Sequence, residues 1–527
     1  MIDRFPEALT VTVPTGGAGR HQGLEYVGML LLQPPPEITP ISGKTWRVGV
    51  DLGTTNTTAF IHDGGAPTQL GLRNLVFLAT QPGEAGETLV SRFVPRETIG
   101  LPFLTLFEEI HRPDRVCDPG AERRRLIPLF DGHIYFLSPA AERVPESDAI
   151  FFDIKWSGGS TGQRVGTEST EADRDRLTAF IHQLCLQVSA EAAAAQASGV
   201  AWRFAYPWSF PKTDVDLLVG TWSHVCEHMS LVTGLRQVGK VEEFTESAAA
   251  AAYFMKAQNA TPAANGTIYV DIGGGTSDVI FWQGNHTDHP FETSLLLAGR
   301  ELLVRPLRRF SLWFDQIAGD EKFGKSVSHH EGFIEAAIRR RSDVIVGNFA
   351  SRLASPQAQR FVTVLGLKLC GLMYYSGLVL RTLIDKRGYR ETVPGIYLGG
   401  NGSRILQWIP YRGFYDNGGG EPLLCRMVRR AARLDTNDIL KLDLSKNPKG
   451  EVAFGLSLPQ LSDILLQQHY DPKRSQAMPE VVSGEDFLTP RDQAHADGFL
   501  TAAHLQQGVQ LCLEMPQFRG FLEAFAE

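Results

Sequence analysis

Apolar and polar residues alternate along the chain in a pattern that predicts strands and helices in turn from Thr45 onward. TWRVGVDLGTTNTTAFI predicts a strand, a Gly/Thr turn and a second strand, and TIYVDIGGGTSDVIFW at 267–282 predicts another such hairpin. Helical spacing predicts helices over 171–196, 213–234 and 359–386, while AWRFAYP and GIYL predict short buried strands. Strands that alternate with helices favour an α/β fold with helix-flanked sheets.

The two ends of the chain differ from this middle part. In residues 1–42, the apolar runs ALTVTV and LEYVGMLLL could pair as strands, and PPPEITPISG is typical of a stiff linker. After about residue 456 the pattern weakens, and from residue 459 on ten acidic residues outnumber four basic ones, a net charge of −6. This acidic segment is either a solvated helical appendage or a tail that docks on a partner.

Composition narrows the class of protein. The 527 residues include 51 Lys and Arg against 59 Asp and Glu, a net charge of −8, so we expect no basic face for nucleic acid. The 6 cysteines lie far apart without a C-x-x-C pair, which favours a reducing compartment. The N-terminus has no signal-peptide layout, and the longest apolar stretch, around 369–380, is too short to span a bilayer. We therefore expect a cytoplasmic, soluble protein without a membrane partner.

Two turns separated by 220 residues, from 51 to 271, echo each other. DLGTTNT at Asp51 and DIGGGTSD at Asp271 each follow a strand and combine an aspartate with glycines and hydroxyl side chains. Glycines let backbone N–H groups approach an anion closely, and hydroxyls add further donors. The aspartates would repel phosphate, so their natural role is to hold a hydrated Mg²⁺ that neutralises it. The pair predicts two lobes of similar topology that grip a polyphosphate from both sides.

These turns resemble the phosphate motifs of the actin, sugar-kinase and DnaK-type ATPase superfamily. DLGTTNT is similar to the first phosphate motif, DIGGGTSD to the second, and LGGNGSRI at 398–405 to the adenosine motif, in the family's order. The resemblance covers about residues 46–456. It implies a two-lobed actin-like fold of duplicated ribonuclease-H-like domains, with ATP or ADP and Mg²⁺ in the cleft between the lobes.

The resemblance also implies how the chain is divided. Residues 1–44 are an N-terminal extension and linker, 45–245 are ATPase lobe I, 246–456 are ATPase lobe II, and 457–527 are an acidic helical appendage. LSDILLQQ at 461–468 is similar to the interdomain linker of the DnaK chaperones, but the residues after it are too few for a peptide-binding domain.

Three further segments resemble sequence motifs of the DnaK chaperones. FFDIKWSGG resembles the segment whose lysine reaches the γ-phosphate, which implies that role for Lys155. FTESAAAAAYF resembles the segment whose acid orients the attacking water, which implies Glu246, although the family's proline is absent and ESAAA is nearer to ParM-type plasmid actins. SKNPKGEVAFG at 445–455 resembles the segment that closes the second lobe, for which a structural role suffices. Without the resemblance, Lys155 is an ordinary surface lysine, and ESAAA is the start of an Ala-rich helix capped by Ser247 or Glu246.

The resemblance assigns the nucleotide site residue by residue. Asp51 and Asp271 would hold Mg²⁺ largely through water and, with Lys155 and Glu246, form the expected catalytic group. The expected nucleotide-binding residues are Gly53, Thr54, Thr55, Asn56, Gly273, Gly274, Gly275, Thr276, Gly299, Glu335, Arg339, Gly399, Gly400, Asn401, Ser403 and Arg404.

Two groups of residues, the proposed adenine-side residues and a separate histidine pattern, each have a competing explanation. Glu335 and Arg339, with Ser342, resemble the family's adenine-side helix, but a solvated helix face also explains them. HVCEH, from His224 to His228, matches an H-x-x-E-H pattern that places two histidines on one helical face for zinc. A structural helix between AWRFAYP and the ESAAA segment is the favoured explanation of HVCEH.

Three uses of such an ATPase remain open. A slowly hydrolysing switch that acts on an unidentified protein partner, through the N-terminal extension or the acidic C-terminal segment, fits the chaperone-like segments best. A ParM-type filament fits ESAAA, so self-assembly stays open. A small-molecule kinase would need an acceptor-side base in the cleft, which the sequence does not identify.

Overall fold

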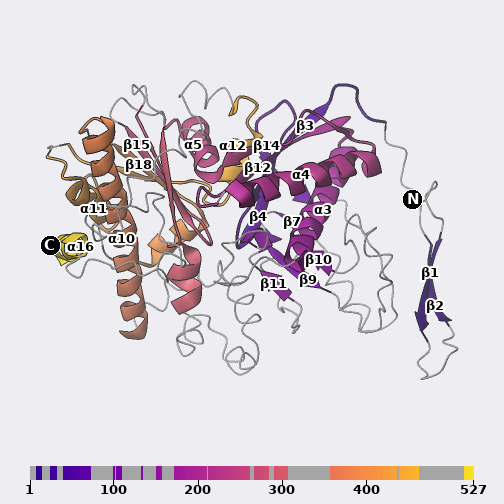
Figure 1. The fold of residues 1–527 in the computed structure, drawn as a ribbon, viewed down its shortest axis with the longest axis horizontal. Coiled ribbons are helices and arrows are strands. Elements are labelled where there is room, and N and C mark those ends of the chain that lie inside the picture. The colour runs from indigo at the N-terminus through magenta and orange to yellow at the C-terminus, as the bar shows by residue number, and fades with distance from the viewer. Residues whose placement is uncertain are drawn as a thin grey trace.

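The computed structural model is mixed α/β, built around two mixed sheets (Figure 1). It describes residues 8–14, 24–31, 39–72, 99–100, 103–109, 132–134, 150–152, 154–156, 171–210, 212–260, 266–283, 290–306, 356–392, 394–409, 411, 413–416, 418–435, 438–461 and 516–526. The predicted α/β class is confirmed at this level.

The first sheet is built around β3 (Thr45–Leu52). β4 (Asn56–His62) pairs with it in antiparallel fashion and β12 (Gly199–Tyr206) pairs with it in parallel. The outer strands are β13 (Arg236–Gln237) and β14 (Glu242–Thr245), both parallel to β12, and β5 (Thr68–Gln69) and β8 (Phe103–Leu104), both antiparallel to β4. Helices α3 (Glu171–Ala194) and α4 (Lys212–Thr233) share a hydrophobic core with these strands.

The second sheet is built around β15 (Thr267–Ile272). β16 (Ser277–Trp282) pairs with it in antiparallel fashion and β18 (Gly395–Gly399) in parallel. The outer strands are β17 (Phe291–Leu295), antiparallel to β16, and β19 (Leu442–Leu444), parallel to β18. Helices α10 (Pro356–Arg387) and α11 (Leu423–Ala432) pack against one another and share a core with this sheet.

The two sheets have the same strand order around their central hairpin. In each, the first hairpin strand lies between its antiparallel partner and a later parallel strand, and a further parallel strand lies beyond that one. The register agrees as well, because Asp51 faces Thr58 in the first hairpin and Asp271 faces Asp278 in the second. The repeated turn of the sequence therefore lies at the same place in two sheets of the same order.

Two helices connect the sheets by crossing from one to the other. α5 (Glu246–Ala257) follows β14 of the first sheet but packs on β15 and β16 of the second. α12 (Glu451–Ser457) follows β19 of the second sheet but packs on β3, β4 and β12 of the first. The two helices touch closely because α5 is rich in alanine and Gly455 lies directly against the Ala249 backbone. Figure 1 shows both helices between the two sheets.

The helices and strands expected from the apolar pattern are confirmed with small shifts at their ends. The expected helices over 171–196, 213–234 and 359–386 are α3, α4 and α10. In residues 1–42, β1 (Ala8–Pro14) and β2 (Leu24–Leu31) pair as the expected antiparallel strands. Of the acidic C-terminal segment, α16 (Pro516–Ala526) is helical and packs on α10 and α11, with the Phe521 and Tyr374 rings 5.5 Å apart. LSDILLQQ beyond Leu461 lies outside the described residues.

The length of the apolar segment around 369–380 was underestimated. Ala358–Asp385 within α10 is the one span among the described residues that is long and apolar enough to cross a membrane by length and composition. In its most apolar window, 61% of the residues are buried inside the protein. A core helix of this kind passes the same test as a membrane span.

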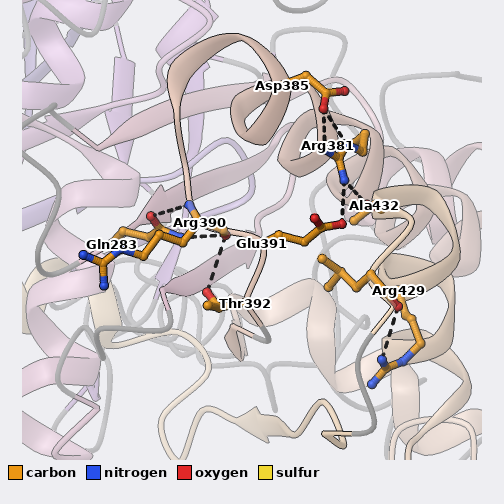
Figure 2. Close-up of polar contacts among 9 residues, drawn as sticks. Gln283, Arg381, Asp385, Arg390, Glu391, Thr392, Arg429 and Ala432 are labelled. Atoms are coloured by element: carbon orange, nitrogen blue, oxygen red, sulfur yellow. Dashed lines mark hydrogen bonds and ion pairs between the residues drawn. The ribbon is translucent and has the colours of Figure 1, made fainter.

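Polar contacts fix the C-terminal end of α10 (Figure 2). Arg381 pairs with Asp385 and Glu391, and its guanidinium also reaches the Ala432 carbonyl of α11 at 3.5 Å. Gln283, which follows β16, donates from Nε2 to the Arg390 carbonyl at 3.1 Å, and its Oε1 accepts from the Arg390 N–H at 3.0 Å. These bonds attach the connection into β18, and so position the glycine turn that follows this strand.

Candidate functional site

A cleft lies where the ends of β3 and β15 meet the starts of α5 and α12. It encloses about 880 Å³, including open solvent at its mouth. Its lining residues are Asp51, Gly53, Thr54, Thr55, Asn56, Glu246, Asp271, Gly273, Gly274, Gly275, Thr276, Gly299, Arg300, Leu303, Gly400, Asn401, Gly402, Ile405, Pro448, Lys449, Glu451 and Val452.

The two repeated turns form opposite walls of the cleft and meet at their tips. A Cβ on Gly275 would lie 2.7 Å from the Thr54 hydroxyl, and one on Gly274 would collide with Thr55. The turns also share their internal shape, because a Cβ on either Gly53 or Gly273 would crowd the carbonyl oxygen three residues later. Glycines on the second turn therefore make room for the threonines of the first.

A third glycine turn lies against the end of β15. Gly400 has a φ of 78°, and a Cβ there would collide with the Asp271 carboxylate and the Ile272 carbonyl. Its N–H donates to Glu451 Oε1 at 3.0 Å. The positive φ and the close approach together require glycine at this position.

Two aspartates and two glutamates line the cleft. Asp51 and Asp271 come from the ends of β3 and β15, while Glu246 and Glu451 are the first residues of α5 and α12. An acidic side chain is favourable in the first turn of a helix because the helix dipole is positive there. With Arg300 and Lys449, the lining holds four carboxylates and two basic side chains.

Burial makes these carboxylates difficult to ionise together. Burial raises the pKa of Glu246 to about 7, against the effect of Lys155, and burial likewise raises the pKa of Glu451 to about 7. Burial, followed by repulsion from Glu451 and Glu246, raises the pKa of Asp271 well above its usual value. A cation that entered the cleft would stabilise the ionised carboxylates.

Lys155 is buried next to the cleft residue Glu246. Its side chain is buried, belongs to a short 3₁₀ turn (Ile154–Trp156), and is ion-paired with Glu246 rather than lining the cleft. It is therefore not the surface lysine of the alternative explanation, and its role toward a γ-phosphate stays a prediction. Glu246 does line the cleft, and Thr245 rather than Glu246 caps α5, accepting from the Ala248 N–H at 3.2 Å.

Lys449 and Glu451 were missed as site residues. The expectation that segment 445–455 is only structural is wrong in this respect, because both side chains line the cleft and Lys449 Nζ bonds Asp51 Oδ2 at 2.6 Å. Burial by itself would lower the pKa of Lys449. The attraction of Asp51, Asp271 and Glu246 is stronger than this effect of burial, so the pKa of Lys449 lies above its usual value. A charged pair that flanks Gly450 at a helix start was the available signal in the sequence.

The structure brings most of the other expected nucleotide-binding residues together. Arg404 and Ser403 follow the third glycine turn but are not among the residues that line the cleft. Gly399 does not line the cleft either, and it lies in contact with the Glu451 carboxylate. Arg300, whose N–H donates to the Gly274 carbonyl at 2.8 Å, lines the cleft and was not expected. The expected adenine-side residues Glu335, Arg339 and Ser342 lie outside the described residues.

The histidines of HVCEH lie on α4, away from the cleft. His228 Nδ1 is 3.3 Å from Nε2 of the buried His182 on α3, and burial, followed by His228 and His224, lowers the pKa of His182 to about 4. Within the described residues, no group of three or more His, Cys, Asp or Glu side chains has an arrangement that could hold a metal ion directly.

A scan of the sequence against protein-family models gives no match, and a search of curated proteins gives none either.

Proposed function

We propose that this chain is an actin-like, DnaK-related ATPase that binds Mg-ATP between two lobes and hydrolyses it slowly. In this proposal each sheet with its helices is one lobe, and the change of nucleotide state alters the contact with a partner protein. The observation that carries the proposal is the pair of turns at Asp51 and Asp271. They occupy equivalent register positions in two sheets of the same strand order and face each other across one cleft.

The cleft residues fit a magnesium–polyphosphate. Once ionised, the four carboxylates would outnumber the two basic side chains and carry an excess of negative charge that a divalent cation would neutralise. Mg²⁺ keeps several waters, so Asp51 and Asp271 could hold it through its water shell. The bound metal would neutralise phosphate charge as the γ-phosphoryl group leaves.

The residues of the chain have separate tasks in this proposal. The N–H groups and hydroxyls of the two turns bind the phosphate oxygens. Glu246 orients the attacking water, and Lys155, which is ion-paired with it, fixes the position of its carboxylate. Lys155 is thus a positioning residue. Loss of the γ-phosphate removes contacts to both turns and lets the two sheets separate, a hinge-type change.

The substitution Asp271→Asn tests the proposed metal role, since it keeps the size of the side chain and removes its charge. We expect single-turnover ATP hydrolysis to fall much more than nucleotide affinity does, because the metal acts mainly on the transition state. Ser294→Ala, a buried polar change on β17 of the same sheet, is the matched control. Equal hydrolysis by wild type and Asp271→Asn would contradict the proposed role of this residue.

A further inference from the structure

Lys449 lies inside the cleft, but the proposed ATP chemistry does not require it. Its ammonium bonds Asp51 at 2.6 Å, although the two residues are 398 positions apart. It also lies against the first turn, 3.0 Å from the position that a Cβ on Gly53 would take. The side chain is only 17% exposed.

The ammonium occupies the centre of the acidic part of the site. Asp51, Asp271 and Glu246 all stabilise its charge, and it in turn favours the ionised form of Glu451. All four carboxylates that line the cleft therefore act on this one ammonium. This is the environment in which a divalent cation would be most strongly stabilised.

We propose that Lys449 makes divalent-cation binding at Asp51 conditional on nucleotide. The inference rests on the proposed Mg-ATP function. Without nucleotide, a metal must compete with the tethered ammonium for the Asp51 carboxylate. When a polyphosphate enters, its oxygens offer Lys449 other acceptors, and Asp51 becomes free to hold the hydrated metal.

The local structure allows this exchange. The backbone before α12 is fixed by a bond from Ser445 N–H to the Leu398 carbonyl at 2.9 Å, and by another from Gly450 N–H to the Asn447 carbonyl at 2.9 Å. The lysine itself has a flexible four-carbon stem and a compact charge. The ammonium can therefore change its partner while the backbone remains in place.

Titration with Mn²⁺ in the absence of nucleotide tests the inference, with bound metal followed by electron paramagnetic resonance. Lys449→Met removes the competing charge and should bind Mn²⁺ about tenfold or more tightly than wild type, the size expected for one charged hydrogen bond. Lys446→Met, an exposed lysine on the same segment, should bind as wild type does. The gain should disappear in Asp51→Asn/Lys449→Met.

Two results would overturn the inference: Mn²⁺ affinity in Lys449→Met no higher than in wild type, or a gain that persists without the Asp51 carboxylate. Thermal melting establishes that each variant is folded. If Lys449→Met does not fold, Lys449→Gln provides the same comparison, because it also removes the charge.

A second titration, with ATP present, separates this inference from the proposed function. ATP should strengthen Mn²⁺ binding more in wild type than in Lys449→Met, since the variant has no ammonium to displace. If ATP binds to neither protein, the proposed function fails, while the nucleotide-free titration still decides whether Lys449 competes with metal at Asp51.

Discussion

Replacement of Lys155 by methionine should destabilise the fold, and the loss should grow at high pH. The ion pair of Lys155 with Glu246 is buried, with side chains 2% and 11% exposed. Removal of one partner of a buried pair leaves the other charge uncompensated, which costs about 3–5 kcal/mol of unfolding free energy when that charge is retained. Methionine keeps the length of the side chain, so that the change removes mainly the charge.

Glu246 determines the pH dependence of this loss. Its pKa in the folded protein is about 7, and Lys155 lowers it, so the pKa should rise further in the variant. Between pH 7 and that higher pKa, the folded variant binds more protons than folded wild type does. Its stability relative to wild type therefore falls as pH rises, by at most about 1.4 kcal/mol per pH unit. From pH 7 to 8.5, the added loss is up to about 2 kcal/mol.

Urea unfolding at pH 6, 7 and 8.5, followed by tryptophan fluorescence, measures this effect. Lys256→Met, an exposed lysine on α5, is the control and should change stability by no more than about 0.5 kcal/mol. Lys155→Met/Glu246→Gln should recover part of the loss, because neither charge remains. Unfolding midpoints of Lys155→Met equal to those of wild type at all three pH values would refute the reasoning.

Two further predictions concern packing and protonation. Gly455→Ala should cost more than about 3 kcal/mol of unfolding free energy or prevent folding, because its Cβ would overlap the Ala249 carbonyl where α12 crosses α5. The control Gly220→Ala, on the exposed side of α4, should be neutral or stabilising, and a melting temperature of Gly455→Ala equal to that of wild type would contradict the expectation. The buried His182 has a pKa of about 4, so below pH 6.5 this residue binds more protons in the unfolded chain than in the folded one. Between pH 7 and 5, wild type should therefore lose about 2 kcal/mol of stability relative to a His182→Leu variant, and urea unfolding of the two proteins measures this difference; the same pH dependence in both would count against it.

The sequence predicted features that depend on neighbouring residues. Alternating apolar residues and glycine turns define the hairpins at Asp51 and Asp271. In β15 the alternation corresponds to residues that face two different hydrophobic cores in turn. Ile268 and Val270 face the core shared with α10, while Tyr269 between them faces the core shared with α5 and α12. The similarity of the two turns also pointed to their common position in two sheets, because hairpin turns of the same length and geometry impose the same register.

The parts of the site that the sequence did not predict depend on distant packing. Lys449 meets Asp51 across 398 residues only because α12 crosses from the second sheet to the first. Lys155 looked like a cleft lysine, but Ile154 beside it is fully buried and brings the lysine inside as well. A buried lysine needs a carboxylate partner, and Glu246 at the start of α5 provides it.

Calorimetric titration with Mg-ATP tests most directly whether the cleft between the two sheets binds nucleotide. We expect one site per chain, with binding that weakens when EDTA removes the metal. At a free Mg-ATP concentration about 100 times its dissociation constant, the same binding should add roughly 2.7 kcal/mol to the free energy of unfolding. Absence of both binding heat and stabilisation with ATP, ADP or GTP at millimolar concentration would contradict the proposed ATPase function.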